Sequence, residues 1–100
     1  MNLRDYEIMV IFDANLDDEA IEKEYHKITS IIEKGKGTVS DSMKWGVRKL
    51  AYPIKHQENG YYYIIDFTGD ERVVNELDRV NKINDKILRH LIVKKEKDLK

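Results

Sequence analysis

The sequence predicts a single α+β domain, spanning residues 1–100, with the elements in the order strand, helix, strand, strand, helix, strand. Three observations lead to this expectation. The first is the length of 100 residues, which suits one domain. Hydrophobic residues make up 41% of the chain, enough for one modest core. Two segments carry apolar residues at helical spacing, whereas the others have extended patterns. This order is that of the ferredoxin-like fold, a four-stranded antiparallel sheet with two helices on one face.

The first strand and the first helix have the clearest patterns. Residues 6–12 are almost all apolar, at odd and even positions alike, which is typical of a strand buried on both faces. Residues 13–15 end this strand, and the acidic residues at 17–19 suit a helix N-terminus. An apolar stripe on one helical face follows, formed by Ile21, Tyr25, Ile28 and Ile32. Gly35 and Gly37 then indicate the end of the helix.

The second half of the chain predicts a hairpin, a helix and a last strand. Residues 39–54 have an extended pattern, and Pro53 favours a sheet edge because it has no N–H to donate. The hairpin turn is expected at residues 57–60, which end in Asn-Gly, and the next strand at residues 61–68. After a turn and cap at residues 69–70, apolar residues form the inner stripe of the second helix: Val73, Val74, Leu77 and Val80. Residues 81–85 end this helix, residues 87–93 form the last strand, and a short basic tail follows from about residue 95.

Charge is segregated along the chain, although the net charge is only −1. Residues 44–56 hold four cations and no acid, and residues 82–100 hold seven cations against three acids. Such a chain can bind a polyanion if folding brings the two basic segments together. The alternative is that these basic segments only make the protein surface soluble and bind no partner.

Several function classes are disfavoured by the residues themselves. The chain has no cysteine, hence no disulfide and no thiolate site, and no apolar run approaches the ~20 residues of a membrane span. The histidines lie in separate elements without metal-ligand spacing. Acylphosphatases share this strand order, but residues 13–15 replace the glycine-rich anion loop that their chemistry needs. We therefore expect no enzyme activity, no cofactor and no small-molecule substrate.

Stacking of single-stranded bases on the open sheet face is also a poor match. The RNA-recognition motif places a cation, a small residue and an aromatic residue at positions that are Asn59, Tyr62 and Asp66 here. Asp66 would put a negative charge where a base should stack.

The segment Gly-Val-Arg-Lys-Leu-Ala-Tyr-Pro-Ile-Lys at residues 46–55 carries the most specific pattern in the chain. It resembles the signature of the bacterial small-subunit ribosomal protein S6 family: glycine, a variable residue, a cation, a polar residue, Leu-Ala-Tyr, a variable residue, isoleucine and a cation. Residues 4–7, 60–62 and 83–93 resemble other parts of that family. The resemblance covers essentially the whole chain. It implies the ferredoxin-like fold and a place in the central domain, or platform, of the small ribosomal subunit.

The resemblance also implies a partner and an RNA site. Members of this family bind small-subunit ribosomal RNA together with ribosomal protein S18, as a heterodimer. The cations of the motif are Arg48, Lys49 and Lys55, and the expected companions are Arg4 and Arg89, since the first and last strands are neighbours in this topology. We expect contacts to phosphates, which arginine binds through two donors. For each cation the alternative is a long side chain that only covers apolar surface. Leu50 and Ile54 are expected in the core.

Trp45 is the candidate contact for the protein partner. It lies on a long second strand whose outer edge would otherwise be exposed, and an extended partner segment is expected to add to that edge. The alternative places Trp45 in the core of the monomer. The expected function is thus a structural component of the cytoplasmic ribosome, with no membrane contact. The alternative function is a free-standing ferredoxin-like regulatory or protein-interaction module.

Overall fold

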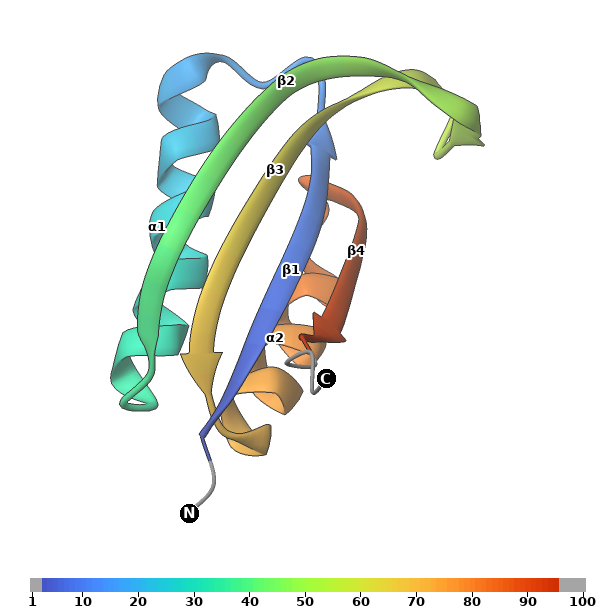
Figure 1. Cartoon of the computed structure of the whole chain (residues 1–100). Helices are drawn as coiled ribbons and strands as arrows, with labels where there is room; N and C mark the ends of the chain where they lie inside the picture. Colours follow the sequence, from blue (N-terminus) through green and yellow to red (C-terminus); the bar gives the residue numbers. More distant parts are fainter. Residues whose placement is uncertain (1–2, 96–100) are drawn as a thin grey trace.

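The computed structural model describes residues 3–95, and it contains the six elements in the expected order (Figure 1). The strands and helices are β1 (Arg4–Asp13), α1 (Asp18–Lys34), β2 (Thr38–Ile54), β3 (Gln57–Gly69), α2 (Glu71–Ile83) and β4 (Ile87–Lys94). Of the basic tail, Lys95 alone is described, and its backbone N–H donates to the carbonyl of Asp5 at 2.8 Å. The other tail residues lie outside the described range.

The sheet has four antiparallel strands in the order β2-β3-β1-β4, which confirms the ferredoxin-like fold. Both helices lie behind the sheet in Figure 1, so one face of the sheet is open. Residues that pair directly across an antiparallel ladder share a face. The register therefore assigns each side chain to the helix-covered face or to the open face.

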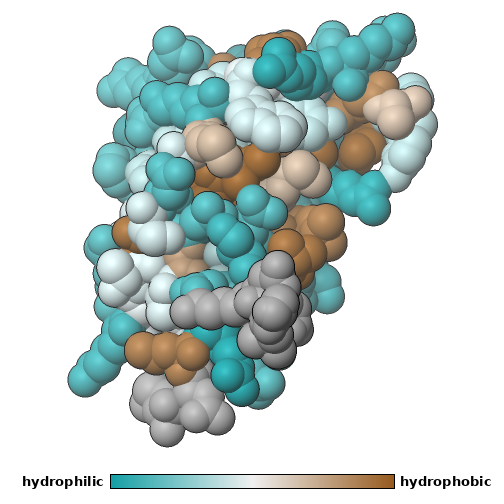
Figure 2. Space-filling model, viewed as in Figure 1, coloured by the Kyte–Doolittle hydropathy of each residue, from teal (hydrophilic) through white to brown (hydrophobic). Residues whose placement is uncertain are grey.

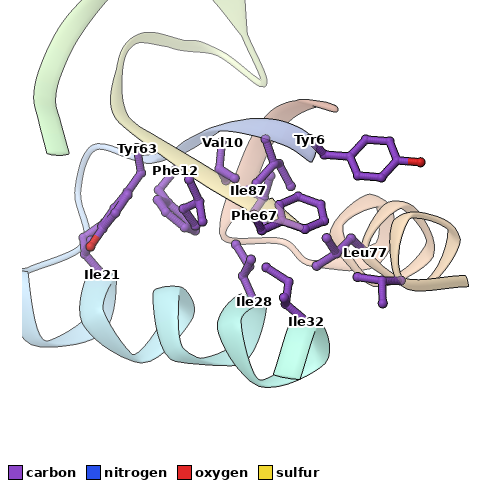
Figure 3. Close-up of a cluster of buried hydrophobic side chains, with 13 residues drawn as sticks. Tyr6, Val10, Phe12, Ile21, Ile28, Ile32, Tyr63, Phe67, Leu77 and Ile87 are labelled. Carbon is purple, nitrogen blue, oxygen red and sulfur yellow. The ribbon is translucent and has the colours of Figure 1, made fainter. Parts of the chain in front are cut away.

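The main core lies between the sheet and the helices (Figure 3). Alternate residues of β1 point into it, among them Ile8, Val10 and Phe12, all fully buried. They meet residues of the helical stripes such as Ile28 and Leu77. Burying one such side chain stabilises the fold by about 1.5–3 kcal/mol. The predicted inner stripes pack against this core, with Tyr25 and Val74 half-buried; the exception is Val80, which is not part of it, and the buried residue of the last turn of α2 is Asn81.

Aspartates cap both helices, as the acidic clusters and the expected cap at residue 70 suggested. The Asp17 carboxylate accepts from Ala20 N–H at 2.8 Å, and the Asp70 carboxylate accepts from Arg72 and Val73 N–H. These bonds satisfy free donors in the first turn. The second helix ends at Ile83, inside the expected range of residues 81–85, and the buried Asn81 continues its inner face.

The hairpin turn is not where the Asn-Gly pair predicts it. Ile54 pairs with Gln57, so the turn consists of Lys55 and His56, both with positive φ (51° and 65°). This is the geometry of a two-residue type I′ turn, here without the usual glycine or asparagine. Asn59 and Gly60 instead pair with Lys49 and Arg48 inside the ladder.

Gly60 is required for packing rather than for a turn. A Cβ at this position would lie 2.3 Å from Ile11 Cγ2 and 3.3 Å from Leu50 Cδ2. Leu50 belongs to a second, smaller apolar cluster on the open face, together with Ile11 and Leu88. Ile54 packs against this cluster, which confirms that Leu50 and Ile54 are core residues. The second cluster holds the end of the β2–β3 hairpin against β1 and β4.

Candidate RNA- and partner-binding surface

The end of the β2–β3 hairpin bends over the open face towards β4. Between the pairs Lys49–Asn59 and Ile54–Gln57, β2 contains residues 50–53 whereas β3 contains only Glu58. Excess residues in one strand bend it and increase its twist. The bend lets Leu50 reach Leu88, and it carries the hairpin end past the last pairs of β1, at the upper right of Figure 1.

Two side-chain contacts fix the bent hairpin to β4. Lys55 Nζ donates to the carbonyl of Ile87 at 3.3 Å. Arg89 Nη1 donates to the hydroxyl of Tyr52. Tyr52 is thus the hydrogen-bond acceptor of a predicted RNA-binding arginine.

Four of the five predicted cations lie at this corner of the molecule. Arg48 pairs with Gly60, Lys55 is in the turn, and Arg89 pairs with Ile11 near the end of β1. Lys49 follows Arg48 at the opposite parity, and all four side chains are exposed. Within residues 3–95, the side chains of Arg48 and Lys49 make no hydrogen bond or ion pair. We call Arg48, Lys49, Lys55 and Arg89 the hairpin cation cluster.

Residues not predicted to take part lie at the same corner. His56 is exposed in the turn, and Lys86 is exposed immediately before β4, where its carbonyl accepts from Asp13 N–H at 2.9 Å. The Asp13 carboxylate accepts from the N–H of Asn15, and this bond, followed by one with the Gln57 side chain, lowers its pKa. Asp13 therefore stays anionic and bonded to its neighbours. The lysine and histidine have no sequence signal beyond their membership of the basic segments.

Arg4 lies far from the hairpin cation cluster. The strands β1 and β4 are neighbours, as expected, but Arg4 pairs with Gly69 at the start of β1, seven residues before Ile11. At about 3.3 Å per residue, this separation is roughly 23 Å. Arg4 also shares the parity of Tyr6, which packs in the main core, so it is on the helix-covered side. The structure does not bring Arg4 and Arg89 together.

The middle of the open face carries an apolar band. One row across the sheet consists of Met43, Ile64, Met9 and Leu91, which pair in that order. Next to it, Trp45 stacks on Tyr62 with ring centroids 6.4 Å apart. Trp45 is 46% exposed, so the alternative that it closes the monomer core is wrong. Leu91, in the neighbouring row, is 54% exposed. Figure 2 views this face, and hydrophobic side chains gather on it between hydrophilic ones.

An acidic row borders the apolar band on the side away from the hairpin end. Asp41, Asp66 and Glu7 pair across β2, β3 and β1. Asp66 Oδ2 accepts from Lys95 Nζ at 3.3 Å, whereas its buried Oδ1 has no hydrogen-bond partner among the described residues. The open face thus passes from cations at the hairpin end, through apolar residues, to carboxylates.

One edge of the sheet is formed by β2, which among the described residues pairs with β3 alone. Bulges at Ser40 and Trp45 interrupt its register. Gly46, beside Trp45, has a φ of +82° with no atom within 4 Å of where a Cβ would stand. On the helix-covered side, Lys44 Nζ lies 2.7 Å from a carboxylate oxygen of Glu22 in α1, and this contact raises the pKa of Lys44. β2 is therefore an edge strand, as predicted.

Two other kinds of site are absent from the described part of the chain. Within residues 3–95, no group of three or more metal-binding side chains is arranged to hold an ion. No helix in that range is long and apolar enough to cross a membrane.

Comparison with known proteins gives consistent matches over nearly the full chain. The profile of the family described as ribosomal protein S6 matches residues 5–94. Small ribosomal subunit protein bS6 of Clostridium perfringens (strain SM101) is 45% identical over 94 residues, which cover 94% of this chain and 99% of that protein. Its counterpart in Clostridium botulinum (strain 657) is 42% identical over 94 residues, or 94% and 100% of the two chains. The crystal structure of 30S ribosomal protein S6 from Thermotoga maritima superposes with a TM-score of 0.87 at 30% identity, covering 94% of this chain and 89% of that one.

Proposed function

Since the chain belongs to the ribosomal protein S6 family of the small ribosomal subunit, we propose that it binds small-subunit ribosomal RNA cooperatively with ribosomal protein S18. Relatives of this kind are structural proteins of the ribosome, so the expectation of a non-catalytic protein is confirmed. The finer proposal comprises an RNA surface, a partner surface and a cytoplasmic location on the ribosome.

The hairpin cation cluster is the observation that carries the RNA proposal. The side chains of two members, Arg48 and Lys49, bond to no other described residue, so their charges are available to a polyanion. Arg89 is held by Tyr52, and Lys55 by the carbonyl of Ile87, which fixes where those charges lie. Structured RNA offers phosphates, hydroxyls and shape more than base edges. We therefore propose contacts to the RNA backbone, with little reading of sequence.

Base stacking on the open face is not part of this proposal. Tyr62 is half-buried beneath Trp45, and Asp66 adds a carboxylate to the same face, next to the apolar band. Anionic and apolar side chains suit a protein partner better than RNA. The apolar band and the edge of β2 are therefore assigned to S18.

The proposed partner surface has three parts, each with its own requirement. The open edge of β2 suits an extended segment that adds a strand through backbone hydrogen bonds. Trp45 and Leu91 provide apolar area that the monomer leaves exposed. The acidic row of Asp41, Asp66 and Glu7 favours a partner with cationic side chains. A cationic partner would also add to the binding of RNA by a chain whose own net charge is −1.

The test is binding of the purified protein to a central-domain rRNA fragment, with and without S18, across a salt series. We expect tight binding only when S18 is present, with an affinity that falls linearly on a log–log scale as salt rises. Binding with no dependence on S18 would contradict cooperativity. No binding in either condition would contradict the RNA proposal and favour the interaction module, which sedimentation of the protein alone would then test as a dimer.

A further inference from the structure

A pocket of about 340 Å³ lies at the end of the sheet opposite the hairpin cation cluster, on the helix-covered side. Its walls come from the start of β1, the end of β4 and the first turn of α2. Six residues line it: Arg4, Tyr6, Asp70, Glu71, Arg72 and Lys94. Half of these residues are cations: Arg4, Arg72 and Lys94. The pocket lies outside the RNA and S18 surfaces proposed above.

The register places three hydrogen-bond donors on one wall of this pocket. Tyr6 pairs directly with Lys94, and Arg4 stands two residues before Tyr6, so all three side chains share the helix-covered side. Directly paired residues have Cβ atoms about 4.5–5.5 Å apart, within the span of one tetrahedral oxyanion and its ligands. The guanidinium, the ammonium and the phenol hydroxyl are therefore able to converge on one group.

The Tyr6 hydroxyl has no role in the core. The ring is buried and stacks on Phe67, with centroids 5.5 Å apart. In Figure 3, Tyr6 lies at the margin of the cluster and its oxygen is directed away from the other labelled side chains. Within the described residues this hydroxyl makes no hydrogen bond, and neither does the side chain of Arg4 or Lys94. Three donors thus face the same pocket, and none of them is used by another residue in the range 3–95.

The two carboxylates of the pocket do not cancel this charge. The Asp70 carboxylate accepts from the backbone of Arg72 and Val73, and its other oxygen binds the Arg72 side chain at 3.1 Å. The hydrogen bond from the Arg72 side chain has the largest effect, and together these bonds lower the pKa of Asp70. Asp70 and Arg72 neutralise one another, which leaves Arg4 and Lys94 against the exposed Glu71.

We propose that this Arg4 pocket binds one phosphate group of the RNA backbone, with Arg4, Lys94 and Tyr6 as its donors. The inference rests on the proposed function, because it takes RNA as the source of the phosphate. Arg4 is too far from Arg89 to contact RNA together with the hairpin cation cluster. The pocket gives it an RNA contact of its own. The protein then contacts RNA at two points roughly 23 Å apart, the length of seven strand residues. Two distant anchors fix the orientation of a protein on a folded RNA better than one cluster does.

The first arm of the test measures the salt dependence of RNA binding with S18 present. The variant R4Q/K94Q removes one arginine and one lysine charge from the pocket. The matched control, R79Q/K23Q, removes the same charges from exposed helix positions outside it. We expect the log–log slope to fall by roughly 0.7–0.9 for R4Q/K94Q, the value of one phosphate neutralised, and to stay unchanged for the control. Equal slopes in the two variants would overturn the proposal.

The second arm separates the pocket from the proposed function. The wild-type chain alone is titrated with inorganic phosphate while backbone amide shifts of residues 4–6 and 94 are followed. We expect saturable shifts that R4Q/K94Q abolishes and Tyr6→Phe weakens, since that substitution removes only the hydroxyl. Absence of saturation would overturn the anion site itself. Saturation by phosphate in a protein whose wild type binds no rRNA would refute the RNA assignment and the proposed function, and leave a site for small phosphate ligands.

Discussion

The hydroxyl of Tyr52, near the end of β2, accepts a hydrogen bond from Arg89 in β4, 37 positions later in the sequence. Tyr52 is 56% exposed, so its ring contributes little to either apolar cluster. The bond instead joins the end of a hairpin to a strand with which that hairpin has no ladder pairing. It both restrains the hairpin and orients the guanidinium, and these two effects can be separated by experiment.

Replacing Tyr52 with phenylalanine should loosen the hairpin end and reduce RNA affinity slightly. One hydrogen bond contributes about 0.5–1.5 kcal/mol, and an exposed one lies near the lower limit, so we expect a loss of affinity of no more than about fivefold. Amide hydrogen exchange at residues 50–58 should become faster, since the tether is removed. Tyr61→Phe is the control, because its half-buried ring packs against the main core on the other face. Equal exchange in both variants would contradict a tethering role.

Removing charge from the hairpin cation cluster should weaken RNA binding in a salt-dependent way. For R48A/K55A we expect the log–log slope to fall by roughly 0.7–0.9 for each phosphate that is no longer neutralised. Lys55 also bonds the carbonyl of Ile87, so thermal unfolding must show that the variant is folded. The control K23A/R79A removes the same charges from the helices. Unchanged affinity and slope in R48A/K55A would exclude these residues from the RNA surface.

The close approach at Gly60 should appear as coupling to Ile11. Gly60→Ala alone is expected to cost about 1–3 kcal/mol, because the new Cβ would overlap Ile11 Cγ2. Adding Ile11→Ala removes the overlapping atom, so the double variant should lose less stability than the sum of the single ones. Urea unfolding of the four proteins measures this coupling. Gly46→Ala should be additive with Ile11→Ala, since no atom lies within 4 Å there.

Gly60 also marks where sequence patterns failed to predict the fold. The strand at residues 6–12 and the helical stripe of α1 were predicted correctly because each depends on a local pattern, although Ile11 is the one open-face residue of that strand that is buried, not the whole second face. Asn59-Gly60 has the composition of a turn, but the glycine is needed by Ile11, 49 positions away in the sequence. The true turn, Lys55-His56, has two left-handed residues without glycine or asparagine, so no local signal marks it.

The candidate site was predicted only in part, because sequence patterns again group residues that are close in the chain and miss contacts between distant ones. The motif correctly grouped Arg48, Lys49 and Lys55 because they are close in sequence. Arg4 was placed by strand adjacency alone, although antiparallel pairing brings the start of β1 to the end of β4. That rule puts Arg4 near Lys94 and leaves Arg89 at the other end. The bond between Tyr52 and Arg89 depends on how far the hairpin bends, which follows from the packing of Leu50 rather than from any short pattern.

Trp45 should contribute to S18 binding while contributing little to folding. A tryptophan buried at the centre of an interface typically costs at least about 2 kcal/mol when truncated to alanine, or roughly 30-fold in affinity. We expect Trp45→Ala to weaken S18 binding by that order, with a smaller change in urea midpoint, because the side chain is already 46% exposed. Calorimetric titration with S18 measures the first effect.

Val47 provides the matched control for Trp45. It is 53% exposed on the same strand, but it pairs with Tyr61 and therefore lies on the helix-covered side. Val47→Ala should leave S18 affinity nearly unchanged if the partner covers the open face. Equal losses in the two variants would instead place S18 along the edge of β2 alone.

The contact between Asp78 and His90 should make stability fall in acid. Asp78 Oδ1 lies 2.8 Å from His90 Nε2, joining α2 to β4, and Lys82 lies 3.2 Å from the other oxygen. Hydrogen bonds from His90 and then Lys82 hold the pKa of Asp78 below the ordinary value for an aspartate. A carboxyl group with a lowered folded pKa contributes stability above its unfolded pKa and loses it as pH falls through the folded one. Wild type should therefore exceed Asp78→Asn in urea midpoint at pH 7, and the difference should shrink below about pH 4.

Glu76 provides the control for Asp78. Glu76→Gln removes a carboxylate that pairs with Arg79 on the same helix. Its urea midpoint should therefore stay close to that of wild type across the same pH range, since an exposed pair within one helix contributes little. A difference between wild type and Asp78→Asn that stays constant from pH 7 to about pH 2 would show that the charge of Asp78 contributes nothing to holding α2 against the sheet.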